Sequence, residues 1–164
     1  MSASRVTARG FSLIELVMVV VIIGIIGAIA VPRLSRGSTG AEEAALAQDL
    51  AILTQAVELY KAEHLGKPPT TKAQLTKPTD EAGNTNNAQV YPYIYGPYML
   101  KIPSLPMGTN RGENDIVTTG NPGDNGGAGW WIDPDTGDVR ANAPDSDLTS
   151  DGVQINTIKG GQLN

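Results

Sequence analysis

The sequence predicts an α+β protein in which one long N-terminal helix packs on a small antiparallel sheet of three to four strands. Two patterns indicate the helix: residues 11–31 are almost wholly apolar, and apolar residues then recur at helical spacing as far as residue 60. Short strand-like runs around a turn that contains proline and glycine indicate the sheet. At 164 residues the chain has room for one domain with a modest core.

The N-terminal apolar segment has the length of a membrane span. Residues 1–10 are polar, contain Arg5 and Arg9, and end in Gly10; the apolar run 11–31 follows. At ~1.5 Å per residue this run makes a helix about 32 Å long, which matches the ~30 Å hydrocarbon core of a bilayer. An ordinary secretory signal has a shorter apolar region, roughly 7–15 residues, with its cleavage site after it. We therefore expect a transmembrane helix at 11–31.

One acidic residue, Glu15, interrupts this apolar run. A carboxylate costs on the order of 2–3 kcal/mol at the centre of an inserted helix and less near the interface. No Lys or Arg lies between residues 10 and 32 to pair with it. Cleavage after Gly10 would create an α-ammonium on Phe11, one helical turn before Glu15, and the same amine on a neighbouring subunit could serve equally well. We expect Glu15 to be functional; the alternative is a stray interfacial carboxylate.

Residues 9–16, with the sequence RGFSLIEL, resemble the processing and methylation site of type IV pilins and type II secretion pseudopilins. The resemblance extends over residues 5–35 and implies a type IV pilin-like fold. It implies that a prepilin peptidase cuts between Gly10 and Phe11 on the cytoplasmic side of the membrane and methylates the new Phe11 amine. It also implies that Glu15 is the assembly glutamate of this family.

The resemblance further implies that the helix softens near Gly24, Gly27 and Pro32 on assembly. Glycine weakens a helix by about 1 kcal/mol, and proline removes one hydrogen bond of the helix. Close helix packing in lipid explains the two glycines equally well. Arginines flank the apolar run on both sides, so charge alone does not fix its orientation.

The helix is expected to continue, amphipathic, through residues 32–65. A polar passage at 33–40 is a place where it could thin or break, and Gly66 with the following prolines ends it. We expect His64, in the last turn, to lie at the surface because it has no partner histidine. The apolar stripe that backs the sheet comprises Leu46, Leu50, Leu53, Val57 and Tyr60.

Residues 66–164 are predicted to form a loop-rich globular domain. Residues 66–90 are expected to be a long surface loop, and the tyrosine-rich segment 91–103 is expected to pack over the helix stripe. An aromatic ligand platform is the alternative for that segment. Residues 129–141 read as a hairpin whose turn contains Pro134 and Gly137, joined by a strand near 115–119.

Composition excludes several classes of function. The formal net charge is −5, and the C-terminal part is the more acidic, which argues against a nucleic-acid partner. There is no cysteine and only one histidine, so disulfides, thiolate chemistry, a zinc site and a histidine-based triad are not expected. The sequence contains neither a G-x-S-x-G motif nor a phosphate loop, and we expect no enzyme.

A calcium site is the one cofactor that the resemblance suggests, because major pseudopilins often bind calcium in their C-terminal loops. Calcium needs six to eight oxygen ligands. The stretch beginning at Asp147 is similar to part of an EF-hand loop, but its twelfth position is Ile158 and not an acid. Solvated turn aspartates are the favoured alternative. The candidate ligands are Asp133, Asp135, Asp138, Asp145, Asp147 and Asp151.

Two functions remain after these exclusions. The first is a structural subunit that self-associates into a helical filament, a type IV pilus or a type II secretion pseudopilus. Its partners would be the prepilin peptidase, the inner membrane and an assembly platform there, and the filament would be periplasmic or on the cell surface. The second is a membrane-anchored extracytoplasmic binding domain that does not polymerise. That alternative predicts no cleavage before Phe11 and no effect of Glu15.

Overall fold

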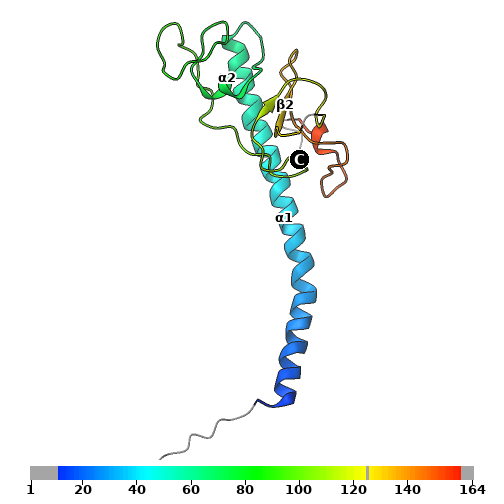
Figure 1. The fold of residues 1–164 in the computed structure, drawn as a ribbon. Coiled ribbons are helices and arrows are strands. Elements are labelled where there is room, and N and C mark those ends of the chain that lie inside the picture. The colour runs from blue at the N-terminus through cyan, green and yellow to red at the C-terminus, as the bar shows by residue number, and fades with distance from the viewer. Residues whose placement is uncertain (1–10, 125, 160–164) are drawn as a thin grey trace, which may run out of the picture. The chain divides into compact units, whose positions relative to one another are not determined.

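A single helix, α1, runs from Leu13 to Glu63. The computed structural model describes residues 11–124 and 126–159, and within α1 the side chains of residues 29–37 are not described. The backbone stays helical through the polar passage at 33–40, so the break considered there is absent and the continuous helix is confirmed. Figure 1 shows this helix as the longest element of the chain.

The chain divides into two compact units, Met1–Ser38 and Thr39–Asn164. In the first unit, the described residues 11–28 belong almost entirely to α1. Among the described residues, no helix combines the length and the apolar character needed to cross a membrane. Residues 29–31, which end the expected span, lie among those whose side chains are not described.

The second unit is built on the C-terminal half of α1. The predicted stripe is confirmed: Leu46, Leu50, Leu53 and Val57 are fully buried, and Tyr60 is nearly so. Because these positions are three and four apart, they lie on one face of the helix and cover the inner side of the sheet. That inner side contributes Trp130, Ile132, Val139 and Ala141 to the same apolar core.

The sheet has three short strands, β1 (Ile116–Val117), β2 (Trp130–Ile132) and β3 (Val139–Ala141), in the order β1-β2-β3. Strands β2 and β3 are antiparallel, which confirms the predicted hairpin. Strand β1 is parallel to β2, so the sheet is mixed and the prediction of a purely antiparallel sheet is wrong for β1. Two neighbouring parallel strands must start at the same edge of the sheet, so the chain between the end of β1 and the start of β2 returns to the edge at which β1 began.

The segment expected to be a long loop, 66–90, contains a short helix, α2 (Lys72–Thr76). The Thr71 backbone N–H donates to the Gln74 side-chain oxygen, 3.1 Å away, which satisfies one of the donors at the start of the helix. Leu75 on this helix is fully buried, so the segment contributes to the core and is more than a surface loop. A 3-10 turn, η1 (Ile155–Thr157), closes the described part of the chain and buries its first two side chains.

Candidate functional site

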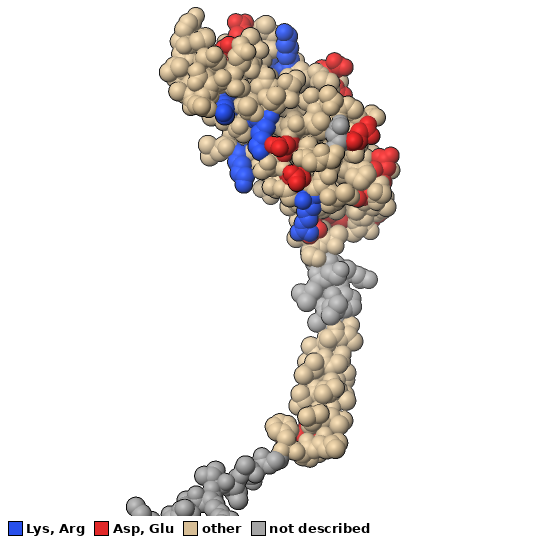
Figure 2. Space-filling model, in the orientation of Figure 1, with Lys and Arg blue, Asp and Glu red and all other residues tan. Residues whose placement is uncertain are grey.

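The described helical part of the first unit exposes apolar side chains on every side. From Leu13 to Ile26 the exposed fraction of each large apolar side chain lies between 44%, at Val17, and 81%, at Leu13. Figure 2 shows this stretch almost without charge, whereas the second unit carries groups of both signs. A helix that is apolar all round requires lipid or other helices to cover it. The surface therefore fits insertion and helix–helix assembly.

Glu15 lies at the start of α1 and contacts the helix's own backbone. Its Oε2 atom accepts a hydrogen bond from the Ser12 backbone N–H at 3.0 Å. Because α1 begins at Leu13, Ser12 is the N-cap residue and Glu15 the third helical residue, so the bond is one half of a Ser-x-x-Glu capping box. The carboxylate also lies at the positive end of the helix dipole. In the sequence from residue 11 to residue 31 it is the only charged side chain.

The other residues of the predicted processing and assembly site are only partly within the described structure. Gly10 lies outside the described residues, so the scissile bond is not described, whereas Phe11 is described and strongly exposed. A Cβ atom added to Gly24 or Gly27 would meet no atom within 4 Å. Pro32 lies inside α1, among the residues whose side chains are not described.

His64 is buried, and the prediction of a surface position is wrong. Its side chain is only 2% exposed. One ring nitrogen, Nδ1, lies 2.8 Å from the Tyr60 carbonyl oxygen, and Nε2 lies 2.9 Å from the Asp80 carbonyl oxygen and 3.0 Å from the Thr79 hydroxyl. Residues 79 and 80 fold over the end of α1 and supply hydrogen-bond partners for the ring. These partners are distant from His64 along the chain, so the sequence around the histidine does not indicate them. The arrangement fastens the loop to the helix, and it places both ring nitrogens against backbone carbonyl oxygens.

The tyrosine-rich segment packs over the helix stripe, as predicted, through Tyr98. The rings of Tyr98 and Tyr60 meet edge to face with centroids 5.4 Å apart. The Tyr98 hydroxyl donates to the Glu63 carboxylate at 2.5 Å, and burial together with this bond raises the pKa of that hydroxyl well above its usual range. Tyr91, by contrast, is 89% exposed.

Asp133 has a structural role in the hairpin turn. Its Oδ1 atom accepts hydrogen bonds from the backbone N–H groups of Thr136 and Asp135, at 3.0 and 2.9 Å. These donors favour the charged form and hold the pKa of the Asp133 carboxyl below its usual range. The carboxylate is thus used by the turn that the sequence predicted from Pro134 and Gly137.

The candidate calcium ligands are not brought together. The described residues contain no group of three or more His, Cys, Asp or Glu side chains placed to hold a metal ion. Several of the aspartates contact different parts of the second unit instead. Asp138 pairs with Lys159, Asp145 accepts from Asn156, and Asp147 accepts from Thr109.

Comparison with known proteins identifies the N-terminal segment. Residues 5–31 match the family model of the prokaryotic N-terminal methylation motif. The matched range includes Gly10, Phe11 and Glu15, together with the large apolar side chains between Leu13 and Ile26 that the structure exposes. Neither the curated proteins nor the solved structures contain a match to the chain.

Proposed function

Residues 5–31 carry the prepilin-type N-terminal methylation signal of type IV pilins and pseudopilins, and from this we propose that the protein is a structural subunit of a filament built from its N-terminal helix. The filament is a type IV pilus or a type II secretion pseudopilus. The absence of cysteine and the small globular domain favour the pseudopilus. The motif points to a structural protein and not to an enzyme.

The observation that carries this proposal is the apolar surface of α1. Between Leu13 and Ile26 every large apolar side chain is at least 44% exposed, around the whole circumference of the helix. Before assembly the lipid of the inner membrane covers this surface, and after assembly the same segments of neighbouring copies cover it. The prepilin peptidase and an inner-membrane assembly platform are the partners that this route requires. The finished filament lies in the periplasm or on the cell surface.

Glu15 supplies the specificity of the assembly step. Cleavage after Gly10 leaves an α-ammonium on Phe11, and methylation keeps that nitrogen positively charged. A carboxylate buried among apolar helices needs a partner, and the Phe11 amine of a neighbouring copy provides one in the same layer of the bundle. The exposed position of Glu15 at the start of α1 supports this role.

Gly24 and Gly27 lie on the same surface, where a Cβ atom would meet open space. They serve either close approach of a neighbouring helix or softening of the stretch that ends at Pro32. Both roles belong to assembly and neither to the fold of the single chain.

Mass spectrometry of the N-terminus of the protein purified from membranes is the first test. The expected product begins with N-methylated Phe11. An intact Met1, or a cut after residue 31, would identify an anchored domain or an ordinary secreted protein and would contradict the proposal.

Substitution of Glu15 is the second test, and the chain offers a matched pair. Glu15→Gln keeps an acceptor for the Ser12 N–H but removes the charge, whereas Glu15→Ala removes both. Both variants are expected to be cut and inserted normally and to form no filaments in electron micrographs of sheared cells. The control Glu58→Gln, an exposed acid on the second half of α1, should assemble normally. Normal filaments from Glu15→Gln would show that capping, and not charge, is the role of this residue.

A further inference from the structure

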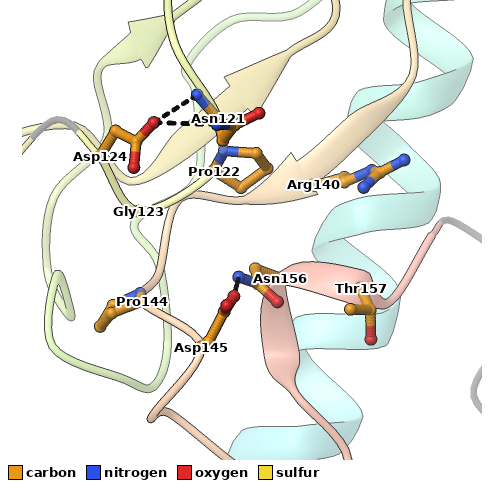
Figure 3. Close-up of a pocket in the computed structure, with 9 residues that line it drawn as sticks. All are labelled: Asn121, Pro122, Gly123, Asp124, Arg140, Pro144, Asp145, Asn156 and Thr157. Carbon is orange, nitrogen blue, oxygen red and sulfur yellow. Dashed lines mark hydrogen bonds between the residues drawn. The ribbon is translucent and has the colours of Figure 1, made fainter.

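Asparagine and aspartate side chains meet at several places in the second unit. In a polar pocket of about 470 Å³ between the loop after β1, the end of β3 and η1, Asp124 accepts from Asn121 and Asp145 accepts from Asn156 (Figure 3). The described residues that line this pocket include no lysine. At the start of α2 the arrangement differs, because a lysine amine contacts both an asparagine and an aspartate side chain.

Lys72, the first residue of α2, places its amine against two consecutive residues of a distant segment. Its Nζ atom lies 2.5 Å from the Asn114 Oδ1 atom and 3.1 Å from the Asp115 Oδ1 atom. Because a lysine side chain has N–H donors only, the oxygen and not the nitrogen of the Asn114 amide faces it. A nucleophile thus contacts a carboxamide, which it can attack, and a carboxylate, which can accept its proton.

The backbone fixes both sides of this contact. The Asp115 carbonyl oxygen accepts from the N–H groups of Gly129 and Trp130, both at 3.1 Å, and β1 begins at the next residue. On the other side, Leu75 of α2 is fully buried in the apolar core. The contact therefore joins two anchored segments whose contacting residues are 42 positions apart in sequence.

The amide carbon of Asn114 is close enough to the amine for attack. A carbonyl bond is about 1.23 Å long, so this carbon lies within about 3.7 Å of the Lys72 Nζ atom. Reacting atoms about 3–3.5 Å apart form a near-attack arrangement, and a rotation about the terminal torsion of Asn114, which has broad preferences, turns the carbon toward the amine. Well-oriented intramolecular reactions reach effective concentrations of about 10⁵–10⁸ M. The reaction has to occur only once in the life of the chain, so a slow step suffices.

We propose that Lys72 and Asn114 form an intramolecular isopeptide bond, with Asp115 as the proton carrier. Asp115 accepts a proton from the Lys72 ammonium, and the freed lone pair of Nζ attacks the Asn114 Cγ atom. Of the three amine protons, one stays on the new amide nitrogen, and two pass by way of Asp115 to the Asn114 amide nitrogen. The Cγ–Nδ2 bond then breaks and ammonium leaves with the positive charge of the lysine. One C–N bond forms and one breaks, and nothing is oxidised or reduced.

The surroundings of the contact suit this reaction and give the bond a use. The Asp115 side chain is 65% exposed, so the ammonium departs directly into solvent. The bond closes a loop from residue 72 to residue 114 and restricts the unfolded chain as a disulfide would, in a protein that has no cysteine. It requires no oxidant, and it does not depend on the filament role.

The test is peptide mapping by mass spectrometry of the full-length chain purified from membranes. The linked protein is expected to be lighter by about 17 Da, the mass of one ammonia, and to yield a branched tryptic peptide that contains both Lys72 and Asn114. The branched peptide is the decisive measurement, because succinimide formation at an asparagine releases ammonia as well. Lys72→Arg keeps the positive charge but not the nucleophilic amine, and should abolish the branched peptide. The matched control Lys77→Arg, at an exposed lysine just beyond α2, should retain it.

Asp115→Asn tests the proton carrier. This variant is expected to form the bond roughly 100-fold more slowly, measured from the linked fraction at successive times after a pulse of synthesis. A wild-type chain that trypsin cuts after Lys72, and in which Asn114 keeps its amide, would overturn the proposal. A bond from Lys72 to Asp115, with loss of water, would overturn the assignment to Asn114. An unchanged rate in Asp115→Asn would overturn the role of Asp115.

Discussion

The imidazole ring of His64 lies flat against the phenol ring of Tyr60, with ring centroids 3.8 Å apart and an angle of 2° between the planes. The spacing of four residues places both rings on one face at the end of α1. Hydrogen-bond contacts at the ring nitrogen Nε2 join that face to residues 79 and 80. One side chain thus connects the last turn of the long helix to the segment that follows α2.

Loss of His64 should destabilise the second unit. His64→Ala removes the stacked ring and the hydrogen-bond partners of Asp80 and Thr79, at a cost of about 3 kcal/mol. His64→Phe keeps a ring of similar size but not the hydrogen bonds, and should cost about 1–2 kcal/mol. Urea unfolding of the full-length chain in micelles, followed by tryptophan fluorescence, measures both. Equal stability of the wild type and His64→Ala would refute the structural role.

Gly129 should tolerate no side chain, while its neighbour Gly126 should. A Cβ atom at Gly129 would lie 2.2 Å from the Glu113 carbonyl oxygen, which already accepts from the Leu105 N–H. Because that neighbour is backbone, Gly129→Ala is expected to cost about 2 kcal/mol or more. At Gly126 a Cβ would meet nothing within 4 Å, so Gly126→Ala is the matched control. Similar thermal midpoints for the two variants would contradict the geometry.

The stability contribution of Asp133 should depend on pH. The Thr136 and Asp135 N–H groups lower the pKa of this carboxyl in the folded state below the unfolded value of about 3.9. A lowered pKa means that the contribution is complete above the unfolded pKa and is lost as the pH falls through the folded pKa. The wild type should therefore melt at a higher temperature than Asp133→Asn at pH 7, and this difference should close as the pH falls from about 4 through the folded pKa. A gap that stays constant on acidification would disprove this origin.

The calcium site remains an untested prediction, and the contacts that the aspartates already make lead us to expect that the chain does not bind calcium. Asp138, Asp145 and Asp147 would have to leave Lys159, Asn156 and Thr109 to gather around an ion. Isothermal titration of the full-length chain with calcium is expected to show no saturable heat. Stoichiometric heat, abolished by Asp147→Asn, would establish the site.

The features that the sequence predicted well are those that depend on neighbours along the chain. The stripe from Leu46 to Tyr60 follows from helical spacing alone, and all its members are buried. The hairpin follows from a turn that contains Pro134 and Gly137. In this turn Asp133 accepts hydrogen bonds from the backbone N–H groups of Asp135 and Thr136. Such signals are local, so no knowledge of the tertiary fold is needed to interpret them.

Helix α2 was predictable but was missed. Thr71 and Gln74 have the spacing of a capping box, and the structure contains the bond from the Thr71 N–H to the Gln74 side chain. The surrounding polar composition of residues 66–90 concealed this signal. Leu75, the one large apolar residue of the short helix, is buried.

The burial of His64 and the direction of β1 could not be predicted in the same way. The partners of His64 at Thr79 and Asp80 come from a segment beyond α2, and nothing near His64 in sequence indicates them. The direction of β1 depends on the path of residues 118–129, which are rich in glycine and carry no periodic pattern. The pocket was missed for the same reason, because Asn121, Asp145 and Asn156 meet only in the folded unit.

Any group that binds the Glu15 carboxylate in place of the Ser12 N–H must interact with it more favourably than that N–H does. Glu15 begins with a neutral donor of its own chain, 3.0 Å away, and because the acceptor is a carboxylate such a bond contributes about 1.5–3 kcal/mol. Another backbone N–H gains nothing by replacing it, whereas a cation adds the attraction between opposite charges, which a neutral donor lacks. The first turn of α1 therefore favours a cation over a neutral donor as the group that replaces the Ser12 N–H on the Glu15 carboxylate.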